Sequence, residues 1–229
     1  MKAIHFGLGA VATIAVTGLA SADVIMDQIG TMDGANTAGG TLHATQEFID
    51  YGAYSIVAMD DFSISEGMNL TSASMVLGGW NGYPGDPGLV QGYTISIFSS
   101  VEAAAGNLYG DVVAVWSDPV AADTAWLGGG HLMTFDLGGA FLAAGDYWLG
   151  ITPLNAIAAG GGQTGVYGSD IGDGSGHQAN LGGGFGMPGN WQHNVGVNHA
   201  YSLEGSAIPA PGALALLGLA GFAGRRRRS

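Results

Sequence analysis

Five histidines are the residues between positions 23 and 207 best suited to bind a metal or to move protons: His43, His131, His177, His193 and His199. None of them lies in H-E-x-x-H, the spacing that places two zinc ligands on one helix face. His193 and His199 are six residues apart, roughly 20 Å along an extended strand, so one ion reaches both only if the chain turns between them. A secreted metal-dependent hydrolase would need His131, His193 or His199 to converge with an acid. The alternative is two half-buried histidines packed with Trp191 and Tyr201.

The acidic residues supply one segment with the composition of a calcium-binding loop, Asp170-Ile171-Gly172-Asp173-Gly174. Carboxylates two to three residues apart around glycines can wrap a hard cation. The segment lacks the closing glutamate of an EF-hand loop. Asp170 and Asp173 are therefore the candidate calcium ligands, a solvated acidic turn is the alternative, and no other cofactor is expected.

The remaining side chains offer little for catalysis. Asp60 and Asp61 point to opposite faces of a predicted strand, and a glycosidase would have to pair one of them with Glu47 or Glu66, although no spacing distinguishes these acids. No serine lies in G-x-S-x-G, and no glycine-rich segment leads into G-K-[ST]. We therefore expect no enzymatic activity.

The aromatic residues point instead to binding. Indole and phenol rings pack on the apolar faces of neutral sugars, and the chain has five tryptophans and eight tyrosines. Trp80 and Tyr83 lie in the turn-like segment Gly78-Gly79-Trp80-Asn81-Gly82-Tyr83, which favours exposure, whereas Trp116 and Trp148 fall within predicted strands. Trp80 and Tyr83 are thus the candidate sugar contacts of a carbohydrate-binding module.

The positions of the basic residues restrict the partners further. Lysine and arginine number 5 against 18 acids, and all five lie at the ends of the chain, as Lys2, Arg225, Arg226, Arg227 and Arg228. A nucleic-acid partner is excluded, because phosphate neutralisation needs Lys and Arg on the binding face. The absence of cysteine excludes disulfides and thiolate metal sites.

The first 22 residues have the pattern of a secretory signal peptide. Lys2 is followed by an apolar stretch and then by the small residues Ala20, Ser21 and Ala22, an A-x-A cleavage site before Asp23. We expect this leader to be removed on export.

The other end combines prolines, an apolar segment and a basic cluster of four arginines. Residues 213–224 are twelve apolar residues, about 18 Å of helix against a hydrocarbon core of about 30 Å, which is short for a permanent span. Pro209 and Pro211 end any helix upstream. The arginines would stay cytoplasmic by the positive-inside rule, which leaves the acidic domain outside.

This order of features resembles the PEP-CTERM protein-sorting signal over residues 208–229. Its sorting motif is matched, with alanine in place of glutamate, by Pro209, Ala210, Pro211 and Gly212. Its basic stop cluster is matched by Arg225, Arg226, Arg227 and Arg228. The resemblance implies export machinery and an exosortase-like processing enzyme as partners, a membrane tether through the C-terminal helix before processing, and a final place at the cell surface. A simple stop-transfer anchor or a basic tail is the alternative.

Between the two ends the sequence predicts an all-β fold, an antiparallel β-sandwich over residues 23–207. Short alternating segments are bounded by Gly, Asn, Asp or Pro, and a single short helix is expected at 101–105. The alternation in 191–203 is long for one strand and predicts a bulge or turn near 194–196. The other predicted strands are 55–64, 70–77, 93–99, 112–117, 131–137 and 147–152.

The succession of Asp60-Asp61-Phe62, the strand from Tyr93, the turn at Gly145-Asp146-Tyr147-Trp148 and the strand from Tyr201 is similar to jelly-roll-like ectodomains that precede PEP-CTERM tails. PEP-CTERM proteins are associated with exopolysaccharide and extracellular matrix. The formal charge of −13 becomes −14 when Lys2 is lost and −18 when the four arginines are lost, which suits a soluble exterior domain. The sequence therefore predicts a non-catalytic, surface-anchored protein of the bacterial envelope or biofilm matrix, with a carbohydrate-binding module as the alternative.

Overall fold

The computed structural model describes residues 22–30, 41–106, 112–159, 162–180, 182–188 and 191–208. Most of the predicted leader, with Ala20, lies outside these residues. The predicted sorting motif and basic stop cluster also lie outside them, namely Pro209, Ala210, Pro211, Gly212, Arg225, Arg226, Arg227 and Arg228. Within the described ranges, no helix has the length and apolar character needed to cross a membrane.

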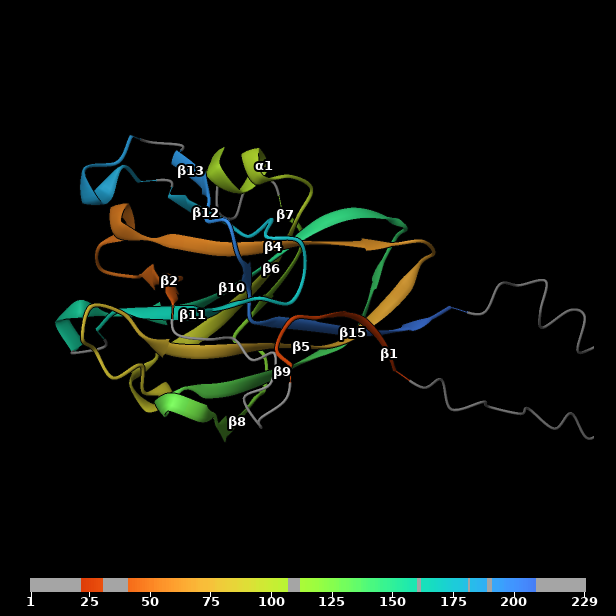
Figure 1. The fold of residues 1–229 in the computed structure, drawn as a ribbon, viewed down its shortest axis with the longest axis horizontal. Coiled ribbons are helices and arrows are strands. Elements are labelled where there is room, and N and C mark those ends of the chain that lie inside the picture. The colour runs from red at the N-terminus through yellow and green to blue at the C-terminus, as the bar shows by residue number, and fades with distance from the viewer. Residues whose placement is uncertain are drawn as a thin grey trace, which may run out of the picture.

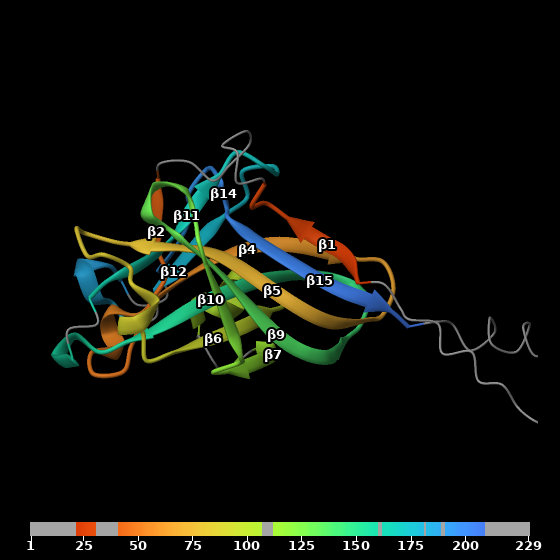
Figure 2. The same ribbon diagram turned by 90° about the horizontal axis from the view of Figure 1, so that it is seen from below.

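The described residues form two β-sheets packed face to face, so the predicted all-β sandwich is confirmed (Figures 1 and 2). Every strand pairing is antiparallel except the two-residue pairing of β3 with β10. The first sheet contains β1 (Asp23–Asp27), β2 (Leu42–Ala44), β5 (Met68–Gly79), β8 (Ala121–Ala125), β9 (His131–Leu142), β11 (Thr164–Ser169), β14 (Asn198–His199) and β15 (Tyr201–Ala207). The second contains β3 (Glu47–Phe48), β4 (Ile56–Ile64), β6 (Gly92–Phe98), β7 (Val112–Ser117), β10 (Gly145–Asn155), β12 (His177–Asn180) and β13 (Trp191–Asn194).

Short helices close the loops. They are α1 (Val101–Gly106) and the 3₁₀ turns η1 (Gly52–Tyr54), η2 (Pro87–Leu89), η3 (Leu127–Gly129), η4 (Ile157–Ala159) and η5 (Gly184–Gly186). The predicted helix at 101–105 is confirmed as α1, which packs Val101, Ala104 and Ala105 on the outer face of the second sheet.

The core lies between the sheets and follows from the period of two along each strand. Met75, Phe135 and Leu203 of the first sheet pack with Ile95 and Ile151 of the second in one buried cluster. Burying a side chain of this size contributes about 1.5–3 kcal/mol, so the alternating segments must turn their apolar faces toward each other.

The predicted long segment 191–203 is divided into three strands. The expected turn is present, because the Asn194 side-chain oxygen accepts from the Gly196 amide at 2.7 Å and Gly196 has a φ of 76°. β13 pairs with β12 in the second sheet, while β14 pairs with β11 in the first. The turn thus carries the chain from one layer to the other. The predictions omitted β1, β2, β3, β8, β11 and β12.

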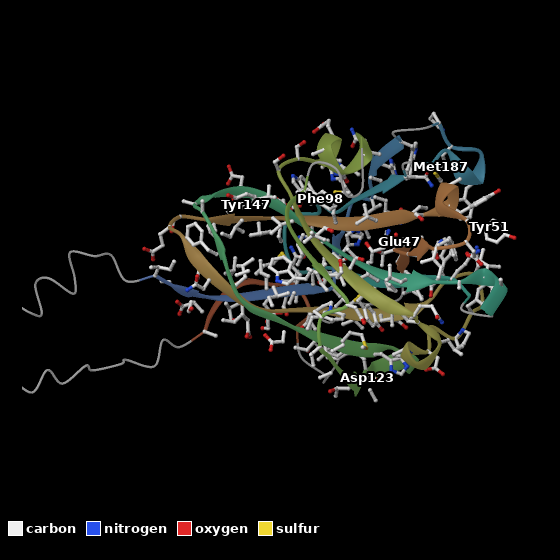
Figure 3. All side chains as sticks on the ribbon, turned by 180° about the vertical axis from the view of Figure 1, so that it is seen from behind. Glu47, Tyr51, Phe98, Asp123, Tyr147 and Met187 are labelled. Atoms are coloured by element: carbon white, nitrogen blue, oxygen red, sulfur yellow. The ribbon has the colours of Figure 1, made fainter. Side chains whose placement is uncertain are left out.

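The two ends of the domain lie together. β1 pairs with β15, and Asp23 stands opposite Gly205, so the first residue of β1 and the last residues of β15 lie at the same end of the sandwich (Figure 1). Figure 3 labels Tyr51 and Met187 at the opposite end. We call that opposite end the distal end.

Candidate functional site

A cavity of about 400 Å³ opens at the distal end, where β2, β5, β12 and β13 meet η5. We call it the aromatic pocket. Its walls carry the rings of Trp80, Phe185 and Trp191 together with Met187, and Ile56 is part of its lining. Met187 is labelled in Figure 3. The pocket therefore gathers aromatic side chains from segments more than one hundred residues apart.

Trp80 reaches the pocket from a tight turn that follows β5. The Tyr83 amide donates to the Trp80 carbonyl at 3.1 Å, and positive φ angles of 53° at Asn81 and 83° at Gly82 are those of a type I′ turn. The turn also requires glycine at position 79, because a Cβ there would lie 1.7 Å from the Tyr83 carbonyl oxygen. The turn thus places the half-buried indole of Trp80 at the rim.

Trp191 and Phe185 form the other wall. Trp191 begins β13, and its ring stacks on that of His193 with centroids 5.8 Å apart and planes inclined by 27°. Phe185 lies in η5 with a φ of 59°, between Gly184 and Gly186, and its ring meets that of Tyr54 edge-on at 4.9 Å. This segment therefore contributes both Phe185 and Met187 to the lining of the pocket.

The polar groups of the pocket are uncharged amides, a hydroxyl and an imidazole. Gln178 Nε2 donates to the Ala44 carbonyl at 2.9 Å, and Asn81 Nδ2 donates to Gln163 Oε1 at 2.8 Å, which orients both amides. His43 also lines the pocket, and burial lowers the pKa of its imidazole. Among the described residues that line it, none is Asp, Glu, Lys or Arg. The pocket is therefore uncharged in a strongly acidic chain.

A buried polar layer lies behind His43. The His43 ring meets the fully buried ring of His199 at 5.1 Å, and the His199 amide donates to Asp60 Oδ2 at 2.5 Å. Burial, opposed in part by that hydrogen bond, raises the pKa of Asp60 to about 7. Burial, with a smaller effect from His43, lowers the pKa of His199 to about 3. Both groups are therefore held largely neutral inside the fold near pH 6.

The structure divides the two predicted sugar contacts. Trp80 lines the aromatic pocket, whereas Tyr83 is not part of its lining and instead packs over Gly162. A Cβ on Gly162 would lie 2.3 Å from the Tyr83 ring. Tyr83 therefore packs against the backbone at Gly162 and is not available as a wall of the pocket.

The histidines proposed for a metal-dependent hydrolase are not brought together. His131 pairs with Asp123 at 3.1 Å on the surface, His193 is exposed beside Trp191, and His199 is buried beside Tyr201. Across the described parts of the chain, no three His, Asp or Glu side chains are grouped so as to hold a metal ion.

The candidate calcium segment is an exposed turn after β11. The Ser175 amide donates to Asp173 Oδ1 at 3.0 Å, and hydrogen bonds from Ser175 lower the pKa of Asp173. Asp170 is also exposed. Of the carboxylates considered for a glycosidase, Asp60 is buried and Asp61 is half-buried, which confirms that only one of them faces the interior.

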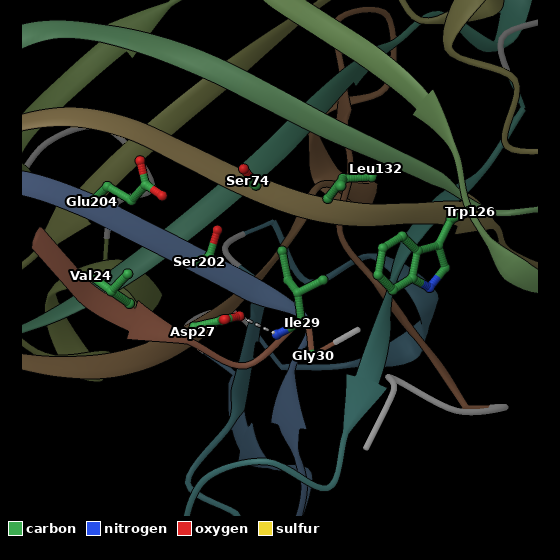
Figure 4. Close-up of a pocket in the computed structure, with 9 residues that line it drawn as sticks. All are labelled: Val24, Asp27, Ile29, Gly30, Ser74, Trp126, Leu132, Ser202 and Glu204. Carbon is green, nitrogen blue, oxygen red and sulfur yellow. Dashed lines mark hydrogen bonds between the residues drawn. The ribbon is translucent and has the colours of Figure 1, made fainter. Parts of the chain in front are cut away.

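A second cavity, of about 290 Å³, lies beside β1 (Figure 4). Its lining includes the carboxylates Asp27 and Glu204, and the Asp27 carboxylate accepts from the Ile29 amide at 3.0 Å. Trp126 forms its far wall in Figure 4. This acidic cavity contrasts with the uncharged aromatic pocket.

Sequence reasoning found Trp80 through its turn, named His43 only as one of five histidines, and missed Phe185 and Gln178. The Gly-Phe-Gly run around Phe185 was the available signal, because glycines on both sides of an aromatic residue favour a tight arch that exposes the ring. Comparison of the chain with protein-family models and with curated proteins finds no match.

Proposed function

We propose that this protein is an exported, non-catalytic component of the bacterial envelope or extracellular matrix that binds neutral carbohydrate in its aromatic pocket. The observation that carries the proposal is the uncharged aromatic lining, with Trp80 and Trp191 in one cavity. Indole rings offer the flat apolar surface on which sugar rings pack, and amides can bond the hydroxyl groups at the ring edge.

The charge of the chain favours a neutral ligand. Eighteen acidic residues give the domain a strongly negative field, which repels acidic polysaccharides, and the described lining of the pocket contains none of these acids. A cationic ligand would find no carboxylate there to pair with. Neutral glycan is therefore the ligand class that fits both the pocket and its surroundings.

The placement of the ends supports surface display. The proposal includes the signal peptide at 1–22, the PEP-CTERM-like segment at 208–229 processed by an exosortase-like enzyme, and a jelly-roll-like connectivity for the sandwich between them. Since β1 and β15 reach the same end, a tether there would leave the aromatic pocket facing away from the membrane (Figures 1 and 3). Such an orientation suits capture of exopolysaccharide.

The test is binding of the purified 23–207 domain to an array of neutral and acidic glycans. We expect retention on neutral glycans, loss of retention in Trp80→Ala and in Trp191→Ala, and wild-type retention in Phe141→Ala. Phe141 is the matched control, because it is an exposed aromatic residue on β9 outside the pocket. Retention that survives both tryptophan substitutions would refute the proposed site, and wild-type retention on no neutral glycan would refute the proposed function.

A further inference from the structure

The aromatic surface does not end at the mouth of the pocket. Phe185 lines the pocket and also contacts Tyr54 edge-on, with ring centroids 4.9 Å apart. Tyr54 is 40% exposed and Tyr51, at the start of the same turn, is 52% exposed. A strip of exposed rings therefore continues from the pocket over Phe185 onto η1.

The backbone at Phe185 is held in a costly conformation. Its φ of 59° and ψ of 20° are left-handed, which costs a bulky residue about 1–2 kcal/mol relative to the right-handed region. The same side chain is 42% exposed, so burial recovers only part of that cost. A strained backbone that displays an apolar ring to solvent is typical of a position selected for binding.

Close backbone contacts fix the strip in place. A Cβ on Gly184 would lie 2.4 Å from the Ala53 carbonyl oxygen, and one on Gly182 would lie 2.1 Å from the Ala53 Cα. Glycine at both positions lets η5 rest directly on η1. The two exposed rings are thus presented by adjoining turns, which reduces the entropy lost when a ligand covers them.

We infer that Phe185 and Tyr54 form a second subsite, which we call the aromatic ledge, and that the ligand is a linear neutral oligosaccharide or polymer rather than a monosaccharide. This inference rests on the proposed function. One sugar residue occupies the aromatic pocket between Trp80 and Trp191. The next sugar residues of the ligand pass over Phe185 and cover Tyr54. A ligand confined to the pocket leaves Tyr54 exposed.

The test is titration calorimetry of the 23–207 domain with neutral gluco-oligosaccharides of one to six residues, in α-1,4-, β-1,3- and β-1,4-linked series. Affinity should rise with length in the series that binds. An aromatic contact contributes about 0.5–1.5 kcal/mol beyond buried area, so Tyr54→Ala should lower the affinity for the longest ligand about twofold to twelvefold and leave the affinity for the shortest ligand unchanged. Phe141→Ala is the control, because Phe141 is an exposed aromatic residue outside the pocket and the ledge, and this variant should bind every length like the wild type.

The two proposals fail differently. If no neutral glycan binds the wild-type domain on the array, the proposed function is refuted and the ledge with it. If a glycan binds through Trp80 but its affinity is independent of length, or Tyr54→Ala binds every length like the wild type, the ledge alone is refuted. A second copy of the chain as the occupant would appear as a dimer in sedimentation that Tyr54→Ala dissociates, and that result would also overturn the inference.

Discussion

Replacing Asp60 with asparagine should change the way in which the stability of the domain depends on pH. The Asp60 carboxyl is fully buried and accepts from the His199 amide at 2.5 Å and from the Ser175 hydroxyl at 3.3 Å. The chain has no Lys or Arg between residues 3 and 224 to stabilise its charge. An asparagine side chain can keep its oxygen toward the His199 amide, while its NH2 group donates to the Ser175 hydroxyl and replaces the oxygen that accepts from the Asp61 amide at 3.2 Å. The substitution therefore removes the titration with little change of shape.

The sign follows from the direction of the pKa shift. Burial raises the pKa of Asp60 from 3.8 to about 7, so between these values the folded state holds a proton that the unfolded state has lost. Stability from this group is thus present at low pH and declines by up to about 1.4 kcal/mol per pH unit, or about 4 kcal/mol in all, as the pH rises to neutrality.

His199 acts in the opposite direction. Burial lowers the pKa of His199 from 6.5 to about 3, so its contribution to stability is lost as the pH falls from 6.5 toward 3, and the lowered pKa of His43 adds to the same loss. Two other titratable residues adjoin this buried layer. Asp61 accepts a hydrogen bond from the Ser175 hydroxyl, and the His177 carbonyl lies 3.1 Å from His199 Nε2. In the wild type the opposing slopes of Asp60 and His199 largely cancel between pH 4.5 and pH 6.5.

The assay is urea unfolding, followed by tryptophan fluorescence, at several pH values between 4.5 and 6.5. This range lies between the ordinary pKa values of Asp, 3.8, and His, 6.5, where both groups titrate differently in the folded and unfolded states. Relative to the wild type, Asp60→Asn should gain about 2–3 kcal/mol of stability as the pH rises across the window, and His199→Gln should lose about as much. Taking differences from the wild type removes the background of the exposed carboxylates. Parallel curves for Asp60→Asn and the wild type would refute the reasoning, because they would mean that Asp60 titrates alike in both states.

Three further predictions concern the turn, the core and the ends. Gly79→Ala should destabilise the domain by about 1–3 kcal/mol in urea unfolding and weaken glycan binding, because its Cβ would overlap the Tyr83 carbonyl oxygen; Gly52→Ala, with open space around it, should do neither. Tyr201→Phe should cost about 1–3 kcal/mol by leaving the buried Ala58 carbonyl without the hydroxyl that donates to it at 2.9 Å, whereas a similar loss in Tyr83→Phe would contradict this assignment. The intact mass of protein recovered from cells should correspond to a chain that begins at Asp23 and lacks the segment after the Pro209 to Gly212 motif, and recovery of the full 229 residues would contradict export and sorting.

Alternation predicted the strands that have one buried and one exposed face. In β7 the burial alternates residue by residue, and its bounds of Val112 to Ser117 match the prediction. β8 escaped prediction because all five of its residues are exposed, and its alanines and Asp123 give no apolar period. β11 escaped for the opposite reason, since five of its six residues are buried and two of the six are glycines. β6 is buried at all seven residues and was still predicted, because its aromatic and β-branched residues favour a strand, a signal that β8 and β11 give only weakly.

The pocket could be predicted only in part for a related reason. Trp80 is marked by local turn chemistry, which the sequence contains within a few residues. His43 and Trp191 reach the same cavity through the pairing of β2 with β11 and of β13 with β12, and such long-range register is not encoded in any local motif. The turn at 194–196 beside Trp191 was predicted, but which sheet each side of that turn joins became clear only from the pairing of β13 with β12 and of β14 with β11.

The indole N–H signals of the five tryptophans test the central claim most directly, in nitrogen–proton correlation spectra of the labelled 23–207 domain. Trp116 donates to the Leu137 carbonyl at 3.0 Å, Trp126 is buried, and Trp148 packs edge-on against His177 at 5.0 Å, so all three serve as internal controls. Adding a neutral oligosaccharide should shift the signals of Trp80 and Trp191 and leave those three in place. Unchanged signals for Trp80 and Trp191 at saturating neutral glycan, or shifts confined to the three control tryptophans, would contradict the account.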